Sequence, residues 1–285
     1  MRRLAKITTK KATALNIEAV DVNQHCDGEE WQVADFDKLA YLIALVALGQ
    51  AYHAETIIRG LALKSQPLGL PALKLQAETL LTVKTDETPW RRDGFLFECI
   101  SWIAARQTGN ANDYMRDPHL KATTQGLDGL MLRVVGGKLK RTTIFEDKCT
   151  KDPKKLFAGQ VMTAFAAYHS DKRASELLAA TGELLRQAKL KPDQVAAAAA
   201  LALTKQLRTY RAGLTVAPNV TDAKNRSDIF DGYDKLAGIS QAQRVAAVLR
   251  VPSPLLRPWC ETLAKAARDH VNAQSDLSAL GITNV

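Results

Sequence analysis

The chain has 285 residues, with 39 Lys or Arg against 30 Asp or Glu and a formal net charge of +9. This length suits one large or two modest domains with a substantial core, and the positive balance suits a polyanionic partner such as nucleic acid. The four cysteines lack Cys-x-x-Cys spacing, no signal-peptide pattern opens the chain, and the longest apolar run, residues 39–49, is too short to cross a bilayer. These features disfavour a zinc site, a disulfide framework, secretion and a membrane protein, so we expect a cytoplasmic protein.

Residues 1–88 are expected to form a helical N-terminal region. The first 30 residues or so are polar and basic with few hydrophobic side chains, which predicts a loosely attached arm or a short strand. Asp35 is a suitable N-cap for the apolar segment that follows it. Helices are predicted over residues 36–51, 54–63 and 70–82.

Residues 89–217 are expected to form an α/β core. Apolar residues recur at helical spacing over 95–106, with Glu98 among them. A loop-like stretch follows up to residue 125, and a connection of this length is often functional. Its residues His119 and Lys121 are candidates for lining a substrate groove, with an ordinary surface loop as the alternative.

Two apolar, β-branched runs flank Gly136-Gly137, a pattern that predicts a β-hairpin over residues 125–150. Side chains two positions apart share a strand face. Glu146 and Lys148 are therefore predicted to point the same way, and Asp147 the opposite way.

The register of this hairpin decides whether Asp128 joins Glu146. A three-residue turn, or the same turn widened by one residue on each side, pairs Val135 with Leu139 and sets Asp128 opposite Glu146. A two-residue turn sends the two carboxylates to opposite faces. We expect the odd-numbered turn. It also pairs Leu130 with Ile144, Leu132 with Thr142 and Arg133 with Arg141.

Two carboxylates that converge with a lysine favour a hard divalent cation such as Mg²⁺, which takes oxygen ligands and keeps several waters. Such an ion binds a phosphate oxygen and lowers the pKa of a water, while an ammonium group steadies the developing charge. This chemistry predicts phosphodiester hydrolysis, with Asp128 and Glu146 as metal ligands and Lys148 assisting the attacking water.

The pattern of Asp128 on one strand and Glu146-Asp147-Lys148 on the next resembles the PD-(D/E)xK nuclease superfamily. The resemblance implies a small restriction-endonuclease-like α/β (mixed) sheet core and Mg²⁺, replaceable by Mn²⁺, as cofactor. It also implies Glu98 on the preceding helix and Gln160 on the following helix as further contributors. A nuclease acting on nucleic acid, DNA rather than RNA, is the implied function. An anti-phage defence role beside a partner helicase or ATPase is an analogy with the superfamily.

After the hairpin, Asp152 and Pro153 predict the start of a helix that extends to about residue 169. Its basic entry is a candidate phosphate contact, because helix N-termini favour phosphate. The basic residues are Lys151, Lys154 and Lys155.

The rest of the chain is predicted to be helical apart from one strand over 209–217. Helices are expected over 173–188 and 194–206, and residues 218–285 are expected to form a helical C-terminal region with helices over 227–238, 240–249 and 258–274. Its basic residues form either a nucleic-acid face or an ordinary solvated face. They are Arg244, Arg250, Arg257, Lys265 and Arg268.

Two other functions stay open at this point. One is a non-catalytic, basic, helical protein that binds nucleic acid or another protein. The other is a hydrolase or transferase that uses the acidic hairpin on a small phosphate substrate.

Overall fold

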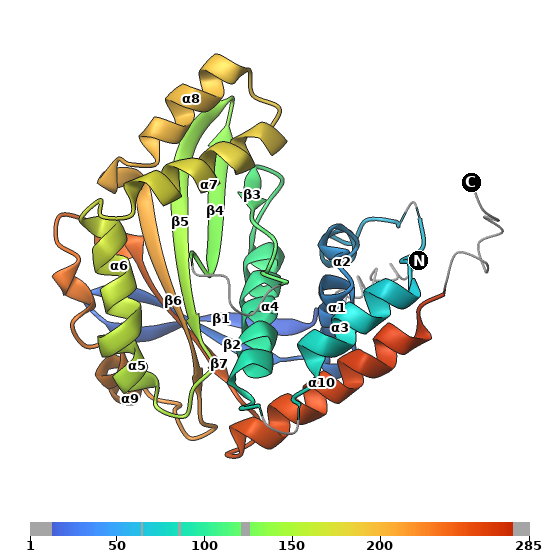
Figure 1. Ribbon diagram of the computed structural model, residues 1–285. Coiled ribbons are helices and arrows are strands. Elements are labelled where there is room, and N and C mark those ends of the chain that lie inside the picture. Colours follow the sequence, from blue (N-terminus) through green and yellow to red (C-terminus); the bar gives the residue numbers. More distant parts are fainter. Residues whose placement is uncertain (1–12, 64, 85–86, 121–125, 276–285) are drawn as a thin grey trace, which may run out of the picture.

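The computed structural model describes residues 13–63, 65–84, 87–120 and 126–275 (Figure 1). Within these ranges no helix combines the length and the apolar character needed to cross a membrane. The strands are β1 (Leu15–Asn23), β2 (Cys26–Val33), β3 (Asp113–Met115), β4 (Gly129–Val135), β5 (Lys138–Lys148), β6 (Arg208–Val216) and β7 (Arg244–Arg250). The α-helices are α1 (Phe36–Ala47), α2 (Ala51–Ile58), α3 (Pro71–Leu81), α4 (Trp90–Thr108), α5 (Pro153–Leu156), α6 (Met162–His169), α7 (Ala174–Gln187), α8 (Pro192–Leu201), α9 (Ala223–Ile229) and α10 (Leu256–Ala273).

The strands form one seven-stranded mixed sheet in the order β1-β2-β7-β6-β5-β4-β3. Strands β2, β7, β6 and β5 run parallel to their neighbours within this group, and antiparallel strands complete the two ends. This confirms the predicted mixed α/β class. The sheet takes strands from all three predicted regions, so the two terminal regions are not purely helical.

Helices cover both faces of the sheet (Figure 1). One face carries a buried cluster built with α1–α4 and α10, and Phe145 points into it. The other face carries a second cluster built with α6–α9 and the turn at residues 157–161, and Ile144 points into that one. Consecutive residues of β5 therefore enter different cores, as the two-residue period of a strand requires.

Of the two alternatives predicted for the N-terminal segment, a loosely attached arm or a short strand, the residues described show the strand, and they form a pair of strands. Strand β1 pairs antiparallel with β2, and Leu15 lies opposite Val33. Strand β1 is at the sheet edge, so most of its side chains keep some exposure and its overall polarity is high. Residues 1–12 lie outside the described ranges.

The helix predicted over 240–249 is wrong, because Arg244–Arg250 form strand β7 between β2 and β6. This segment contains Ala, Leu and Arg, which favour helices in isolation, but its burial between two parallel strands outweighs that preference. The predicted strand over 209–217 is confirmed as β6, which is buried along its whole length. The loop predicted over 108–125 contains the short strand β3.

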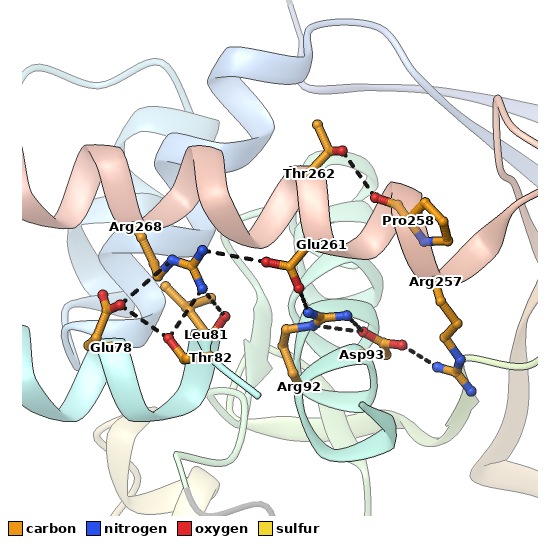
Figure 2. A network of polar contacts seen from close by, with 10 residues as sticks. All are labelled: Glu78, Leu81, Thr82, Arg92, Asp93, Arg257, Pro258, Glu261, Thr262 and Arg268. Atoms are coloured by element: carbon orange, nitrogen blue, oxygen red, sulfur yellow. Dashed lines mark hydrogen bonds and ion pairs between the residues drawn. The ribbon is translucent and has the colours of Figure 1, made fainter. Parts of the chain in front are cut away.

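Helix α10 is held to α3 and α4 by ion pairs that Figure 2 shows. Arg92 contacts both Asp93 and Glu261, and Arg257 contacts Asp93, whose side chain is fully buried. Arg268 reaches the carbonyl of Leu81.

Most of the basic residues predicted for a nucleic-acid face have partners within the fold. Arg244 is buried against backbone carbonyls, Arg250 pairs with Glu30, and Arg257 and Arg268 join the network of Figure 2. These four arginines stabilise the fold, and Lys265 is exposed and pairs with Asp269.

Candidate active site

The β4–β5 hairpin turns through two residues, so the predicted odd-numbered turn is wrong. Gly136 and Gly137 have φ values of 57° and 73°, which glycine adopts without strain, and Val135 lies opposite Lys138. A β-bulge then inserts Lys140 into β5, since Val134 pairs with Leu139 while the next pair joins residues 133 and 141.

The bulge restores the register that the odd turn was expected to give. Leu130 pairs with Ile144 and Gly129 with Phe145, and the same register continued by one residue sets Asp128 opposite Glu146. The further predicted pairs, Leu132 with Thr142 and Arg133 with Arg141, are also present. The Arg133–Arg141 pair is tolerated because Asp113 accepts two hydrogen bonds from Arg133.

Asp128, Glu146 and Lys148 meet at one point. The Lys148 Nζ atom lies 2.8 Å from Asp128 Oδ2 and 3.2 Å from Glu146 Oε2. The backbone N–H of Asp147 donates to the same Asp128 oxygen at 2.9 Å. Asp128, directly before β4, and Glu146, in β5, therefore share one cation.

The cluster holds two carboxyl groups and one ammonium group. Burial first and the neighbouring Asp128 carboxylate second raise the pKa of Glu146 to about 8, against the opposing effect of the Lys148 ammonium. Burial alone would lower the pKa of Lys148, but the two carboxylates outweigh burial and hold that pKa above its ordinary value. The site is therefore poised to accept further positive charge.

The cluster opens into a pocket of about 420 Å³ between α4, the start of β4, the end of β5 and the helix that follows β5. Glu146 is recessed, with 6% of its side chain exposed, whereas Asp128 keeps 30%. The lining residues are Trp90, Arg91, Gly94, Phe95, Glu98, His119, Asp128, Asp147, Lys148, Cys149, Leu156 and Gln160.

Glu98 and His119, both predicted candidates, lie together on the pocket wall. Glu98 Oε1 is 2.8 Å from the backbone nitrogen of His119 and 2.8 Å from its ring Nδ1. Burial raises the pKa of Glu98, while these contacts with His119 oppose the rise. Glu98 therefore ties the segment before β4 to α4 at the edge of the site.

Gln160 also lines the pocket, from an unexpected conformation. It lies in a π-helical turn, Phe157–Val161, which joins α5 to α6 in the helix predicted over 153–169. Such turns often occur at functional sites. The π-helical turn keeps the exposed Gln160 on the pocket side while Phe157 and Val161 remain buried.

Other predicted nucleic-acid contacts stand apart from the pocket. Lys151, Lys154 and Lys155 are exposed around the start of α5, and they do not belong to the pocket lining. Lys121 lies outside the described residues.

Seven of the lining residues were not predicted as site residues, and three of them carry an ionisable carboxyl, a guanidinium or an indole side chain. Asp147 lies on the opposite face from Glu146, yet the residue still lines the pocket, and its buried Oδ1 atom has no hydrogen-bond partner among the described residues. Burial raises the pKa of Asp147 to about 7, although Arg211 acts to lower it. The other two, Trp90 and Arg91, begin α4 after a polar linker, and a Trp-Arg pair at a helix start was the only signal for them.

The donors suit a hard cation that retains most of its waters. Within the described part of the chain, no three His, Cys, Asp or Glu side chains converge as a complete metal centre. Asp128 and Glu146 remain as two oxygen donors that already share one cation, and burial first and the Asp128 carboxylate second raise the pKa of Glu146. One or two carboxylates plus waters and substrate oxygens are the usual ligand set of Mg²⁺.

Comparison with known proteins finds no matching family model, no matching curated protein and no matching solved structure.

Proposed function

We propose that this protein is a Mg²⁺-dependent nuclease that hydrolyses phosphodiester bonds of nucleic acid, with DNA favoured over RNA. The observation that carries the proposal is the shared contact of Asp128, directly before β4, and Glu146, in β5, with the Lys148 ammonium beside a pocket that Asp128 and Lys148 line. The order of elements around it also supports the proposal: a helix bearing Glu98, the hairpin, and then a helix bearing Gln160.

The roles of the residues follow from their positions. Asp128 and Glu146 would hold the cation, which when bound polarises a phosphate oxygen and lowers the pKa of a coordinated water. The backbone N–H of Asp147 fixes the Asp128 carboxylate. The Lys148 ammonium would leave the space between the two carboxylates when the cation binds, and it would then orient the attacking water and neutralise charge that develops on the phosphate.

The surrounding residues position the substrate rather than react with it. Glu98 and His119 fix the pocket wall next to Asp128, and the Gln160 side chain offers both a donor and an acceptor from the opposite wall. A partner helicase or ATPase, a defence role and a cytoplasmic location remain predictions from the sequence.

The test is a cleavage assay on plasmid DNA, linear duplex, single-stranded DNA and RNA, with Mg²⁺, Mn²⁺ or EDTA. Lys148→Ala and Glu146→Gln are each expected to lower the rate by about 100-fold or more, because each removes charge stabilisation from the transition state. The matched control is Lys138→Ala, at the other end of β5 and roughly 30 Å away at about 3.3 Å per residue. This control should cleave like the wild type.

Two outcomes would refute the nuclease proposal. The first is that no nucleic acid is cleaved with either metal while binding persists, which favours a non-catalytic protein. The second is turnover of small phosphoesters with no action on polymers, which favours a different phosphate-transferring enzyme.

A further inference from the structure

An exposed tryptophan stands at the mouth of the candidate site. Trp90 is the first residue of α4, it is 55% exposed, and it lines the same pocket as Asp128 and Lys148. The guanidinium carbon of Arg91 lies 5.3 Å from the centre of the Trp90 ring. Arg91 is itself exposed, and its ion pair with Glu87 is long, at 3.8 Å.

The exposure of Trp90 sets it apart from the other tryptophans of the chain. The chain has four tryptophans, and Trp31, Trp102 and Trp259 are 0%, 1% and 8% exposed. Those three fill the core on the α4 and α10 side of the sheet. The Trp90 ring contributes little to that core, so the fold gives it no packing reason to be large and aromatic.

The volume of the pocket and the burial of Glu146 bear on which form of nucleic acid can reach the carboxylates. Glu146 is recessed, and the pocket of about 420 Å³ has the size of a site for a small molecule, roughly 300–1,000 Å³. A pocket of this size matches the volume of a single nucleotide rather than of a base pair with its neighbours. In a duplex both faces of a base are covered by its neighbours, whereas an unpaired base offers a free face to an aromatic ring.

We propose that Trp90 stacks on an unpaired nucleobase next to the scissile phosphate, with Arg91 contacting the backbone, so that the substrate is single-stranded nucleic acid or a single-stranded segment. This inference rests on the proposed function and adds the substrate class. Trp90 is a positioning residue in this scheme. Stacking on an aromatic side chain is tolerant of base identity. The Trp90 platform, by which we mean the exposed Trp90 ring with Arg91 beside it, therefore distinguishes single strands from duplexes and does not distinguish base sequences.

The test measures binding without cleavage. Because the other tryptophans are buried beyond the reach of a stacking base, a change of intrinsic fluorescence on binding in EDTA reports mainly on Trp90, and the protein is titrated with oligo-dT and with a duplex of equal length. Oligo-dT is expected to quench the emission and the duplex to quench it little. Trp90→Ala should weaken oligo-dT binding, measured by anisotropy of a labelled strand, by about 5- to 150-fold, the range of one lost stacking contact.

Two further variants separate stacking from a general loss of structure. Trp90→Phe keeps an aromatic face and should recover most of the affinity. Tyr52→Ala removes an aromatic residue of similar exposure, 58%, from α2 and outside the pocket, and should bind like the wild type. Equal quenching by duplex and single strand, wild-type affinity in Trp90→Ala, or no binding of single strands would each overturn the platform.

Different results would refute the Trp90 stacking proposal and the nuclease proposal. Quenching and selective binding without turnover in Mg²⁺ would support the platform and refute the nuclease. Equal cleavage of duplex and single strands without quenching would refute the platform and leave the nuclease standing.

Discussion

Removing the Lys148 ammonium tests the charge balance at the centre of the site. In Lys148→Met, the Glu146 and Asp128 carboxylates would face each other with no shared cation. Removing one partner of a fully buried ion pair costs about 3–5 kcal/mol. Asp128 and Lys148 are 30% and 22% exposed, so solvent screens part of this loss, and we expect the free energy of unfolding to fall by about 1–3 kcal/mol at pH 8.

The loss should depend on pH in a defined direction. The folded-state pKa of Glu146 is raised to about 8 from an ordinary value of 4.5, so the folded protein holds this proton more tightly than the unfolded chain. Stability therefore falls as pH rises between these two values. Because Glu146 can take a proton at pH 6, the Lys148→Met loss should be smaller at pH 6 than at pH 8.

Urea denaturation in EDTA at the two pH values measures the effect. Glu146→Gln/Lys148→Met should recover most of the stability at pH 8, since one carboxylate alone has no like-charged neighbour to repel. Lys138→Met, on the same strand, should behave as the wild type. An equal loss at both pH values, or no loss at pH 8, would refute the argument that Lys148 compensates two converging carboxylates.

Three other predictions concern residues around the site. The metal-free wild type should lose stability as pH rises toward 7, because burial raises the pKa of Asp147 to about 7 from 3.8, and Asp147→Asn should make this loss smaller. Melting temperatures across pH 5–8 in EDTA measure the effect, and an unchanged pH profile would contradict it. Gly213→Ala should cost about 1–3 kcal/mol in urea denaturation, because a Cβ at residue 213 would overlap the Asp147 carboxylate, and wild-type stability would count against that close approach. Arg92→Ala should cost about 2–4 kcal/mol because it removes one of the arginines paired with the buried Asp93, whereas Lys265→Ala on the exposed face of α10 should stay within about 0.5 kcal/mol; equal effects would contradict a buried network.

The candidate site was predictable from sequence because its determinants are local. The Gly136-Gly137 pair marks the turn, and the spacing of Glu146 and Lys148 puts both on one strand face. The turn length was predicted wrongly and the register correctly, because the bulge at Lys140 adds the residue that the turn lacks. Nothing in the run Lys138-Leu139-Lys140-Arg141 distinguishes a bulged residue from a paired one.

The strands far from the hairpin were not predictable in the same way. Strand β7 gains its conformation from β2 and β6, which are more than twenty residues away in sequence, so its local helix preference was misleading. Strand β1 has period-2 alternation at Leu15 and Ile17, but a register shift after Val20 interrupts it. Its edge position also leaves it polar enough to resemble a loop.

Trp90 and Arg91 could not be recognised as pocket residues from the sequence. Trp90 and Arg91 gain significance only because α4 begins beside the end of β5, and the sequence separates these segments by nearly sixty residues. Any aromatic residue at a helix start has the same local pattern. Only the structure shows that the Trp90 side chain is exposed and lines the pocket.

The most direct test of the shared cation site is a crystal of the protein soaked in Mn²⁺ and measured for anomalous scattering. The account predicts a peak with one oxygen each from Asp128 and Glu146 as ligands and with Lys148 Nζ moved away from the space between them. A map in which Lys148 still joins the two carboxylates, with no peak beside them at saturating Mn²⁺, would contradict it.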